Sequence, residues 1–528
     1  PLKRLVFLPI LCVSLALVWA FGLMGLWGLP LSLLTLIVPV FLIAVGTAYC
    51  LHILSTFSRY LPHHQAVRDT VFETYAEMAL PTVLAVVTTV IGLTSLLLNH
   101  ITAIREFAVF AVMGMFALLV MVLVFMPAFL LILPMPLGER ARPALASRLV
   151  DRFTDLVVGL NRGGRRPIHL FVLAALVFLA LLGVWRLQVE TSPVAYFQED
   201  TEIATHFRDI YQHLSGSFPA NVVVAAQEAD FFEAPEHLRI IEGLQAHLET
   251  LPGVDKTISF VDDLKLVNYA TNRYEVDHYV LPEADFEIRM LINTYRSMLG
   301  KEMMTPFMVA DFSRTNILLM TRFKRSGEFL ELRREVLEHA QAAYSRDLTT
   351  TVTGLGVTLS ASSRALTSGQ IYSLCMTLVV VFVILALLCL SFKVALISLL
   401  PNIFPIVITF GVMGWLEIEL SMVTSLIASV AIGLAVDDTI HYLVRYNREI
   451  KKDLDKQRAM TATLSHLVRP VVYTSLTIGL GFSILTLSSF IPTAVFGLMM
   501  ILTLCSALVG DLVILPTLLQ RTELATLL

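Results

Sequence analysis

Charged residues are scarce in this chain of 528 residues. Asp, Glu, Lys and Arg make up 15% of it, against about 25% in soluble domains, while hydrophobic residues make up 56%. The net charge of −4 gives no general attraction to phosphate. These shortages exclude a disordered chain, a nucleic-acid-binding protein driven by basic patches and an ordinary cytosolic enzyme. The composition, with a mean hydropathy of +0.76, is that of an integral membrane protein.

Cysteine and the common catalytic motifs are also scarce. The five cysteines all fall inside hydrophobic runs, so the long polar segment of residues 187–370 holds no disulfide scaffold. That segment contains no HExxH, GxSxG, paired CxxC or P-loop pattern, so nothing in it indicates a hydrolase or an ATPase. We therefore expect no metal site and no bound cofactor.

Long hydrophobic runs are abundant. A run of about 20 residues suffices for a helix to cross about 30 Å of hydrocarbon. Ten runs predict ten membrane-spanning helices, and the chain is therefore expected to be a polytopic α-helical membrane protein. The runs are Leu5–Trp27, Leu31–Phe57, Thr82–Leu98, Ile104–Leu133, Ile168–Arg186, Ile371–Leu390, Val394–Trp415, Leu420–Tyr446, Val471–Ser489 and Thr493–Leu519.

Basic residues predict the orientation of these helices. They gather in the connections Pro134–Pro167 and Tyr446–Pro470, whereas the short loops at the other ends of the helices have no Lys or Arg. The positive-inside rule places both basic connections in the cytoplasm. Alternation then puts residues 187–370, with a net charge of −10, on the outer side, which is the periplasm if the membrane is a bacterial inner membrane.

The polar segment of residues 187–370 has a mixed pattern. Strands and helices alternate so as to suggest two split βαβ halves, a ferredoxin-like α+β domain. The expected strands are Ala220–Gln227, Lys256–Val261, Thr315–Phe323 and Thr349–Thr358, and the expected helices are Pro235–Thr250, Glu283–Leu299 and Glu328–Tyr344.

The hydrophobic segments repeat at one offset. His52 and His441, Pro81 and Pro470, and Pro127 and Pro516 are each 389 residues apart, and the same offset aligns about 130 residues without a gap. Chance similarity of hydrophobic sequence would not preserve the positions of Pro and His, so the chain holds an internal duplication. Both copies have the same orientation, which makes the repeat a parallel one, as in some transporters.

The duplication suggests a division of the chain. We expect a four-helix first repeat at 1–133, a cytoplasmic connector at 134–167, a helix at 168–186, the external porter-like domain at 187–370 and a five-helix second bundle at 371–520. A helix, an external domain and a further helix precede the second copy but not the first. A full protein would thus carry roughly 220–250 more residues upstream, on this chain or on a separate one.

Two neighbouring acids lie within a predicted span. Asp437 and Asp438 stand four and three residues before His441, so both can share a helix face with its imidazole. Asp437 lies about 12 Å inside the boundary set by Arg445, where a carboxylate costs at least about 2.5–3.5 kcal/mol. Adjacent carboxylates cannot both ionise cheaply there, which favours a site that loads and releases H⁺. A structural network at a helix kink is the alternative.

These residues resemble a known family. The run Gly-Leu-Ala-Val-Asp-Asp-Thr-Ile-His at 433–441, followed by Tyr442 and the pair Arg445-Tyr446, resembles the fourth-helix motif in each half of resistance-nodulation-division (RND) exporters. The nearest branch comprises the MMPL, hydrophobe/amphiphile efflux and hopanoid-associated proteins, which are related to Patched. The resemblance covers essentially the whole chain. It implies a proton relay at Asp437 and Asp438, and external domains that move hydrophobic or amphiphilic cargo.

The first repeat departs from that pattern. Its matching positions hold Ala48 and Tyr49, so the relay would be asymmetric, with Tyr49 and His52 as neutral hydrogen-bond partners. For His52, an ordinary core histidine is an equal alternative. Asp511 on the last helix is a further candidate, or a capping residue near the cytoplasm.

Two hydroxyl residues, Thr474 and Ser475, could hydrogen-bond Asp438, although such residues more often bond backbone carbonyls.

The expected function is proton-driven export of lipid-like molecules from the inner membrane, with H⁺ as the coupling ion and no enzyme activity. The partners would be hydrophobic cargo, the membrane, and either a second copy or a chain carrying the upstream helices. A lipid sensor without proton coupling is one alternative, because the first repeat resembles a sterol-sensing domain. An intramembrane aspartyl protease is another, with Asp511 as the second acid.

Overall fold

The computed structural model describes the following residues: 5, 7–63, 66–132, 145–162, 166–189, 196–213, 216, 218–323, 325–343, 348–453 and 455–521. The chain forms two compact units. The helical unit contains residues 1–189 and 365–528, and the α+β unit contains residues 190–364. Each unit is described by itself below, and the arginines at positions 140, 142 and 165 of the predicted connector lie outside the described residues.

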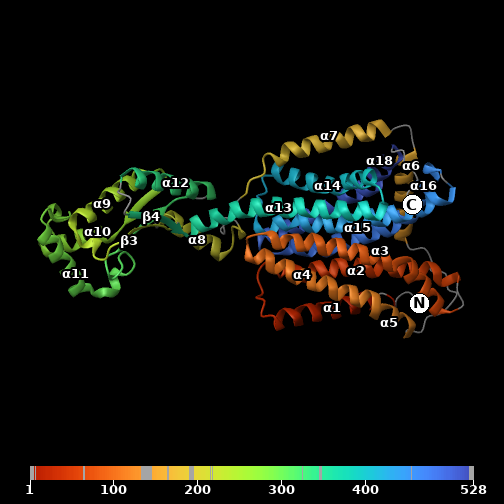
Figure 1. The fold of residues 1–528 in the computed structure, drawn as a ribbon, viewed down its shortest axis with the longest axis horizontal. Helices are drawn as coiled ribbons and strands as arrows, with labels where there is room; N and C mark the ends of the chain where they lie inside the picture. The colour runs from red at the N-terminus through yellow and green to blue at the C-terminus, as the bar shows by residue number, and fades with distance from the viewer. Residues whose placement is uncertain are drawn as a thin grey trace. The chain divides into compact units, whose positions relative to one another are not determined.

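The helical unit consists of long apolar helices (Figure 1). The first repeat contains α1 (Phe7–Leu26), α2 (Ile37–Tyr60), η2 (Leu61–His63), α3 (Val67–Ser95), η3 (Leu96–Leu98), α4 (Thr102–Val120), the π-helical segment η4 (Met121–Phe125) and α5 (Met126–Ile132). The helices α6 (Leu145–Arg162) and α7 (Arg166–Val184) follow. The second repeat contains α13 (Leu355–Cys389), α14 (Phe392–Trp415), α15 (Met422–Asp453), α16 (Lys456–Ser483), η8 (Ile484–Leu487), α17 (Ile491–Val509), the π-helical segment η9 (Gly510–Ile514) and α18 (Leu515–Arg521).

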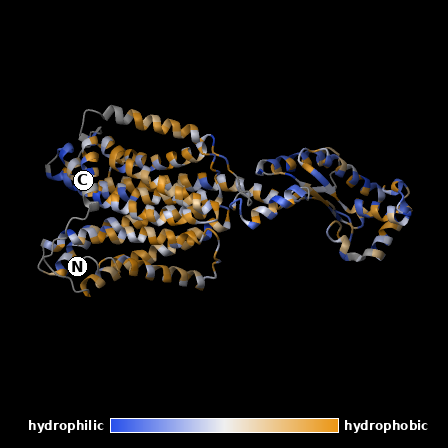
Figure 2. Cartoon of the chain, turned by 180° about the vertical axis from the view of Figure 1, so that it is seen from behind, coloured by the Kyte–Doolittle hydropathy of each residue, from blue (hydrophilic) through white to orange (hydrophobic). Residues whose placement is uncertain are grey.

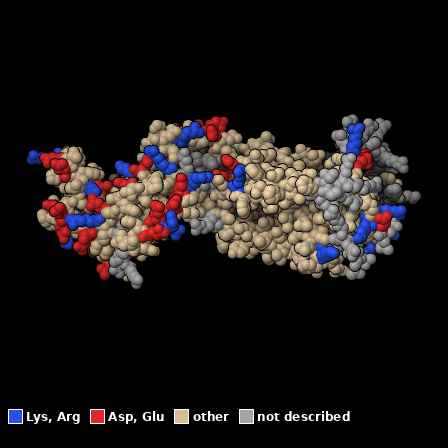
Figure 3. All heavy atoms as spheres, turned by 90° about the horizontal axis from the view of Figure 1, so that it is seen from above, with Lys and Arg blue, Asp and Glu red and all other residues tan. Residues whose placement is uncertain are grey.

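The membrane character of the fold is confirmed. Among the described residues, nine helical segments are long and apolar enough to cross a membrane, and a shorter apolar helix covers Phe171–Val184. Together they correspond to the ten predicted spans. Hydrophobic residues dominate the helical unit in Figure 2. On the face seen in Figure 3, charged residues gather at the ends of that unit and leave its described flank uncharged, as a hydrocarbon surrounding requires.

Three helices begin well before the runs that predicted them. Helix α3 begins at Val67 instead of Thr82, α13 begins at Leu355 instead of Ile371, and α16 begins at Lys456 instead of Val471. A hydrophobicity criterion stops where polar or charged residues enter the sequence, but the backbone hydrogen bonds of a helix continue past that point. The connector also contains a helix, α6, which the sequence analysis did not predict. Its side chains Asn161 and Asp151 hold it to the second repeat, through the carbonyl oxygen of Leu512 and the guanidinium of Arg469.

The duplication extends to the backbone. The bounds of α4, η4 and α5 recur in α17, η9 and α18 at the offset of 389 residues, so both repeats place a π-helical segment at the same point. The repeats also exchange contacts: α2 packs on α16, and its counterpart α15 packs on α3. This reciprocal packing is that of a parallel repeat with a pseudo-twofold axis between its halves.

Small residues bring the repeats close together. A Cβ atom added to Gly433 of α15 would lie 3.1 Å from the Cα of Thr89, and one added to Gly92 of α3 would lie 3.1 Å from the carbonyl oxygen of Ser429. The hydroxyl of Thr89 donates a hydrogen bond to the carbonyl oxygen of Gly433 at 3.1 Å. The helix carrying the two acids is therefore fixed against the first repeat one turn before Asp437.

The α+β unit contains a four-stranded sheet in the order β2-β3-β1-β4, with every neighbouring pair antiparallel. Its elements are α8 (Glu202–His213), β1 (Ala220–Ala226), η6 (Phe231–Glu233), α9 (Pro235–Glu249), β2 (Val254–Ile258), α10 (Phe260–Thr271), η7 (Val276–His278), α11 (Asp285–Met304), β3 (Arg314–Thr321), α12 (Ser326–Ala343) and β4 (Leu348–Gly354). Central β1 and β3 are linked to the edge strands through α9 and α12, which confirms the predicted ferredoxin-like fold. Helices α10 and α11 are inserted between β2 and β3.

Candidate proton-relay site between the two repeats

The acidic pair lies in the middle of α15, the most deeply buried long helix of the bundle. Asp437 and His441, one turn apart, are both 9% exposed, and Oδ1 of Asp437 lies 3.4 Å from Nε2 of His441. That separation is an ionic contact without hydrogen-bond geometry, and Oδ1 has no hydrogen-bond partner among the described residues. The carboxylate is thus buried beside one imidazole, and its Oδ1 accepts no hydrogen bond from the described residues.

The first repeat contributes Tyr49 and His52 from α2, and both side chains are buried. The rings of His52 and His441 stack with their centroids 5.0 Å apart and their planes 10° apart. Two positive charges at that distance repel by about 3 kcal/mol at an effective dielectric constant of about 20, so the stack accommodates one added proton more readily than two. These residues are repeat mates, and the stack therefore lies on the pseudo-twofold axis.

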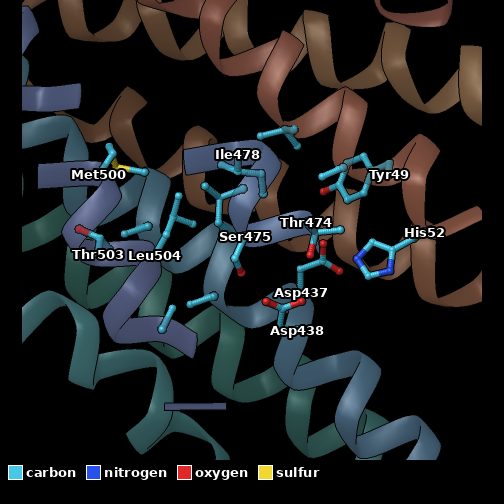
Figure 4. A pocket seen from close by; sticks show the side chains of 16 residues that line it. Tyr49, His52, Asp437, Asp438, Thr474, Ser475, Ile478, Met500, Thr503 and Leu504 are labelled. Atoms are coloured by element: carbon cyan, nitrogen blue, oxygen red, sulfur yellow. The ribbon is translucent and has the colours of Figure 1, made fainter. Parts of the chain in front are cut away.

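A small cavity joins these residues to the second repeat. It is lined by Tyr49, His52, Asp437, Asp438 and parts of α16 and α17, and it has room for about one water molecule. Figure 4 shows the side chain of Asp437 between those of Thr474 and His52. Thr474 and Ser475 also line the cavity, but the hydroxyl of Thr474 donates to the carbonyl oxygen of Val471 at 2.9 Å. Its hydrogen bond goes to the backbone, the alternative considered for it above.

Asp511 lies on the other side of α15. The hydroxyl of Thr439 donates to Oδ1 of Asp511 at 2.5 Å, and the amide of Asn402 donates to that hydroxyl at 3.3 Å. Asp511 is 3% exposed and belongs to the π-helical segment η9. Asp438 lies within electrostatic reach of both Asp437 and Asp511. The carboxyl groups of Asp437, Asp438 and Asp511 therefore lie near one another. None of them pairs with Lys or Arg among the described residues.

Sequence reasoning identified the three acids but missed Asn402. Its position in an apolar helix between Pro401 and Pro405 is a usable signal, because a buried amide in hydrocarbon needs partners. Asp438 lies within electrostatic reach of Asp511, so the arrangement of the acids does not exclude the aspartyl protease alternative. The choice between a protease and a transporter must therefore come from elsewhere.

Comparison with known proteins supplies that choice. The sequence matches the profile of the MMPL family over residues 4–162 and 198–522. This chain belongs to the MMPL family. A protein of Methanocaldococcus jannaschii, named as a putative membrane protein, is 32% identical to this MMPL protein over 125 residues, which are 24% of this chain and 32% of the relative. The match spans about a third of that relative's length. The family assignment confirms the predicted resemblance to the RND superfamily.

Proposed function

We propose that this MMPL protein couples the downhill movement of protons to the export of hydrophobic or amphiphilic molecules. Members of the family are transporters rather than enzymes, and RND-type transporters handle hydrophobic substrates. The observation that carries the proton coupling is the position of Asp437. It is buried at the contact of the two repeats, faces one imidazole and lines a cavity large enough for water. A buried carboxyl group with these surroundings can exist with or without its proton.

The charge change acts where the repeats meet. When Asp437 is ionised, it attracts a protonated His441 and thereby the stacked His52 of the first repeat. When Asp437 takes up a proton, that attraction disappears, and the contact of α15 with α2 and α3 loses an electrostatic component. Each proton moved down the field supplies about 2.3 kcal/mol per 100 mV, enough over a few charges to change the packing of two repeats. The external α+β unit would carry the cargo.

The first test follows protonation directly and needs no knowledge of the cargo. A lipid-soluble carbodiimide reacts with protonated carboxyl groups in membranes, and peptide mass spectrometry identifies the modified residue. We expect labelling of Asp437 that decreases as the pH rises, and no labelling at this position in Asp437→Asn. The exposed Asp69→Asn is the matched control and should leave labelling of Asp437 unchanged.

The second test measures transport in the intact protein. Inverted membrane vesicles with an imposed pH gradient are loaded with the hydrophobic dye Nile red as a probe. We expect Asp437→Asn and Asp438→Asn to reduce gradient-dependent dye movement at least tenfold, with normal amounts of folded protein. Full movement in both variants would exclude the relay. Saturable lipid binding that ignores the pH gradient would instead support the sensor alternative.

A further inference from the structure

A second cavity lies next to the relay site, on the side of the basic α15–α16 connection. It is lined by residues of α2, α3, α15 and α16, and it has room for several water molecules. His52 lines both cavities, and its stacked partner His441 lines the second one. The histidine pair therefore separates the acid-lined cavity from this second space, which we name the axial vestibule.

The vestibule is built from the same positions of both repeats. Twelve of its thirteen lining residues form six pairs that are 389 residues apart, and only Val444 has no mate among them. The pairs are His52 and His441, Thr56 and Arg445, Arg59 and Arg448, Glu77 and His466, Met78 and Leu467, and Pro81 and Pro470. A cavity lined in this way surrounds the pseudo-twofold axis between the two repeats.

Exposure increases along the vestibule from the histidine pair outward. His52 and His441 are 6% and 9% exposed, whereas the side chain of Arg59 is 41% exposed and Arg448 and His466 are also exposed. Charged groups that reach the surface at the end of a bundle contact water or lipid headgroups. The vestibule thus opens at the end with the basic connection and closes at the histidines.

Charged groups from all four helices face the vestibule. Glu77 of α3 accepts hydrogen bonds from Arg59 at 2.9 Å and from the hydroxyl of Tyr60, and it lies 3.6 Å from the guanidinium of Arg445. Arg445 also contacts Glu449 at 3.0 Å. His466 of α16 lies within electrostatic reach of Arg59, Glu77, Arg445 and Glu449. Glu77 thus connects both repeats, and its repeat mate His466 is a second proton-accepting group on the axis.

We infer that the axial vestibule is the path by which the relay exchanges protons with the cytoplasm, with His441 as the carrier at its inner end and Glu77 and His466 as the outer proton acceptors. The inference rests on the proposed function, because it needs a proton on Asp437. In the releasing step, the free ring nitrogen of His441 takes the proton of the Asp437 carboxyl group and leaves a carboxylate. The other ring nitrogen then gives its proton to vestibule water, and a ring flip turns this free nitrogen toward Asp437 for the next transfer.

The first experiment tests whether water reaches the vestibule, independently of the relay. The five native cysteines are replaced, and single cysteines are introduced as Met78→Cys, its repeat mate Leu467→Cys and the buried control Val86→Cys. A membrane-impermeant sulfonated maleimide is added to sealed vesicles of either orientation. Labelling of both vestibule positions from the cytoplasmic side alone, at least tenfold above Val86→Cys, is expected. Labelling from the opposite side, or no labelling, would overturn the inference even if Asp437 proves essential.

The second experiment tests the two outer acceptors. Carbodiimide labelling of Asp437 is followed after a pH jump on one side of sealed vesicles, and it should follow the cytoplasmic pH. The double variant Glu77→Gln/His466→Gln should slow that response at least tenfold. The exchange variant Glu77→His/His466→Glu should restore it to within about threefold, because the axis makes the two positions equivalent. An unchanged response in the Gln variant, or no recovery in the exchange variant that retains folded protein, would refute the assignment.

Discussion

The two repeats of the helical unit share a backbone but not a charge pattern. Their last helices begin, widen into a π-helical segment and end at matching positions. Yet the positions of Asp437, Asp438 and Asp511 hold Ala48, Tyr49 and Val122 in the first repeat. Symmetric packing therefore does not require symmetric chemistry. At the acid-lined cavity, the second repeat supplies the carboxyl groups, and the first repeat supplies Tyr49 and His52.

The largest expected effect comes from moving the acid to the other repeat. Ala48 and His52 have the same spacing as Asp437 and His441. Asp437→Ala should abolish gradient-dependent dye movement, and Ala48→Asp/Asp437→Ala should recover part of it and become labelled by carbodiimide at position 48. Peptide mass spectrometry and the vesicle assay measure both. A folded exchange variant without labelling at position 48 would show that the two faces of the cavity are not equivalent.

A smaller effect is expected at the π-helical segments. Asp511→Val gives the second repeat the residue of the first, and it leaves the buried hydroxyl of Thr439 only the longer hydrogen bond to Oδ1 of Asn402 at 3.4 Å. The cost should be about 1–3 kcal/mol, read as a lower thermal unfolding temperature in detergent by circular dichroism. Asp511→Asn retains an acceptor oxygen and should cost less. Equal losses in the two variants would argue against the hydrogen bond as the cause.

Glycine substitutions at the contact between the repeats are expected to change the stability by a still smaller amount. A Cβ atom at Gly481 would lie 2.8 Å from the Cβ of Ala44, whereas one at Gly479 would meet nothing within 4 Å. Gly481→Ala should therefore destabilise the bundle by about 1 kcal/mol. Gly479→Ala should stabilise it by about 0.5–1 kcal/mol, because alanine loses less entropy in a helix. Thermal unfolding in detergent measures both, and the same sign for both would contradict close packing at Gly481.

The smallest expected effect is a pH dependence of the stability of the α+β unit, which does not involve the two repeats. Burial, and then the ring of His247 stacked at 3.7 Å, lower the pKa of His339. Because the pKa of His339 is lower in the folded state, the unfolded chain binds more protons at this residue. The contribution of His339 to the free energy of unfolding is therefore complete above the unfolded pKa of about 6.5 and decreases as the pH falls below that value. Hydrogen exchange in α9 and α12 of the intact protein should accelerate at low pH, after correction for intrinsic rates. His339→Gln should remove that excess.

The sequence predicted what depends on spacing along one helix. Asp437 and His441 share a face because they are four residues apart, and the 389-residue offset in the sequence identifies His52 as the counterpart of His441. It did not predict Asn402 beside Thr439, because that contact depends on how α14 packs on α15. Nor did it predict the π-helical turn that carries Asp511, because one widened turn leaves the apolar pattern of the helix unchanged.

The widened turn at Gly510–Ile514 also determines what moves with what. A π-helical segment shifts the pattern of backbone hydrogen bonds, and in this segment the carbonyl oxygen of Leu512 accepts a bond from Asn161 of α6. In the first repeat, the corresponding segment binds a partner within the same repeat, because the carbonyl oxygen of Val122 accepts a hydrogen bond from the hydroxyl of Tyr75. The connector helix α6 is thus attached to the second repeat. If the halves rock, its two contacts with that repeat would make α6 move with the half that carries the acids.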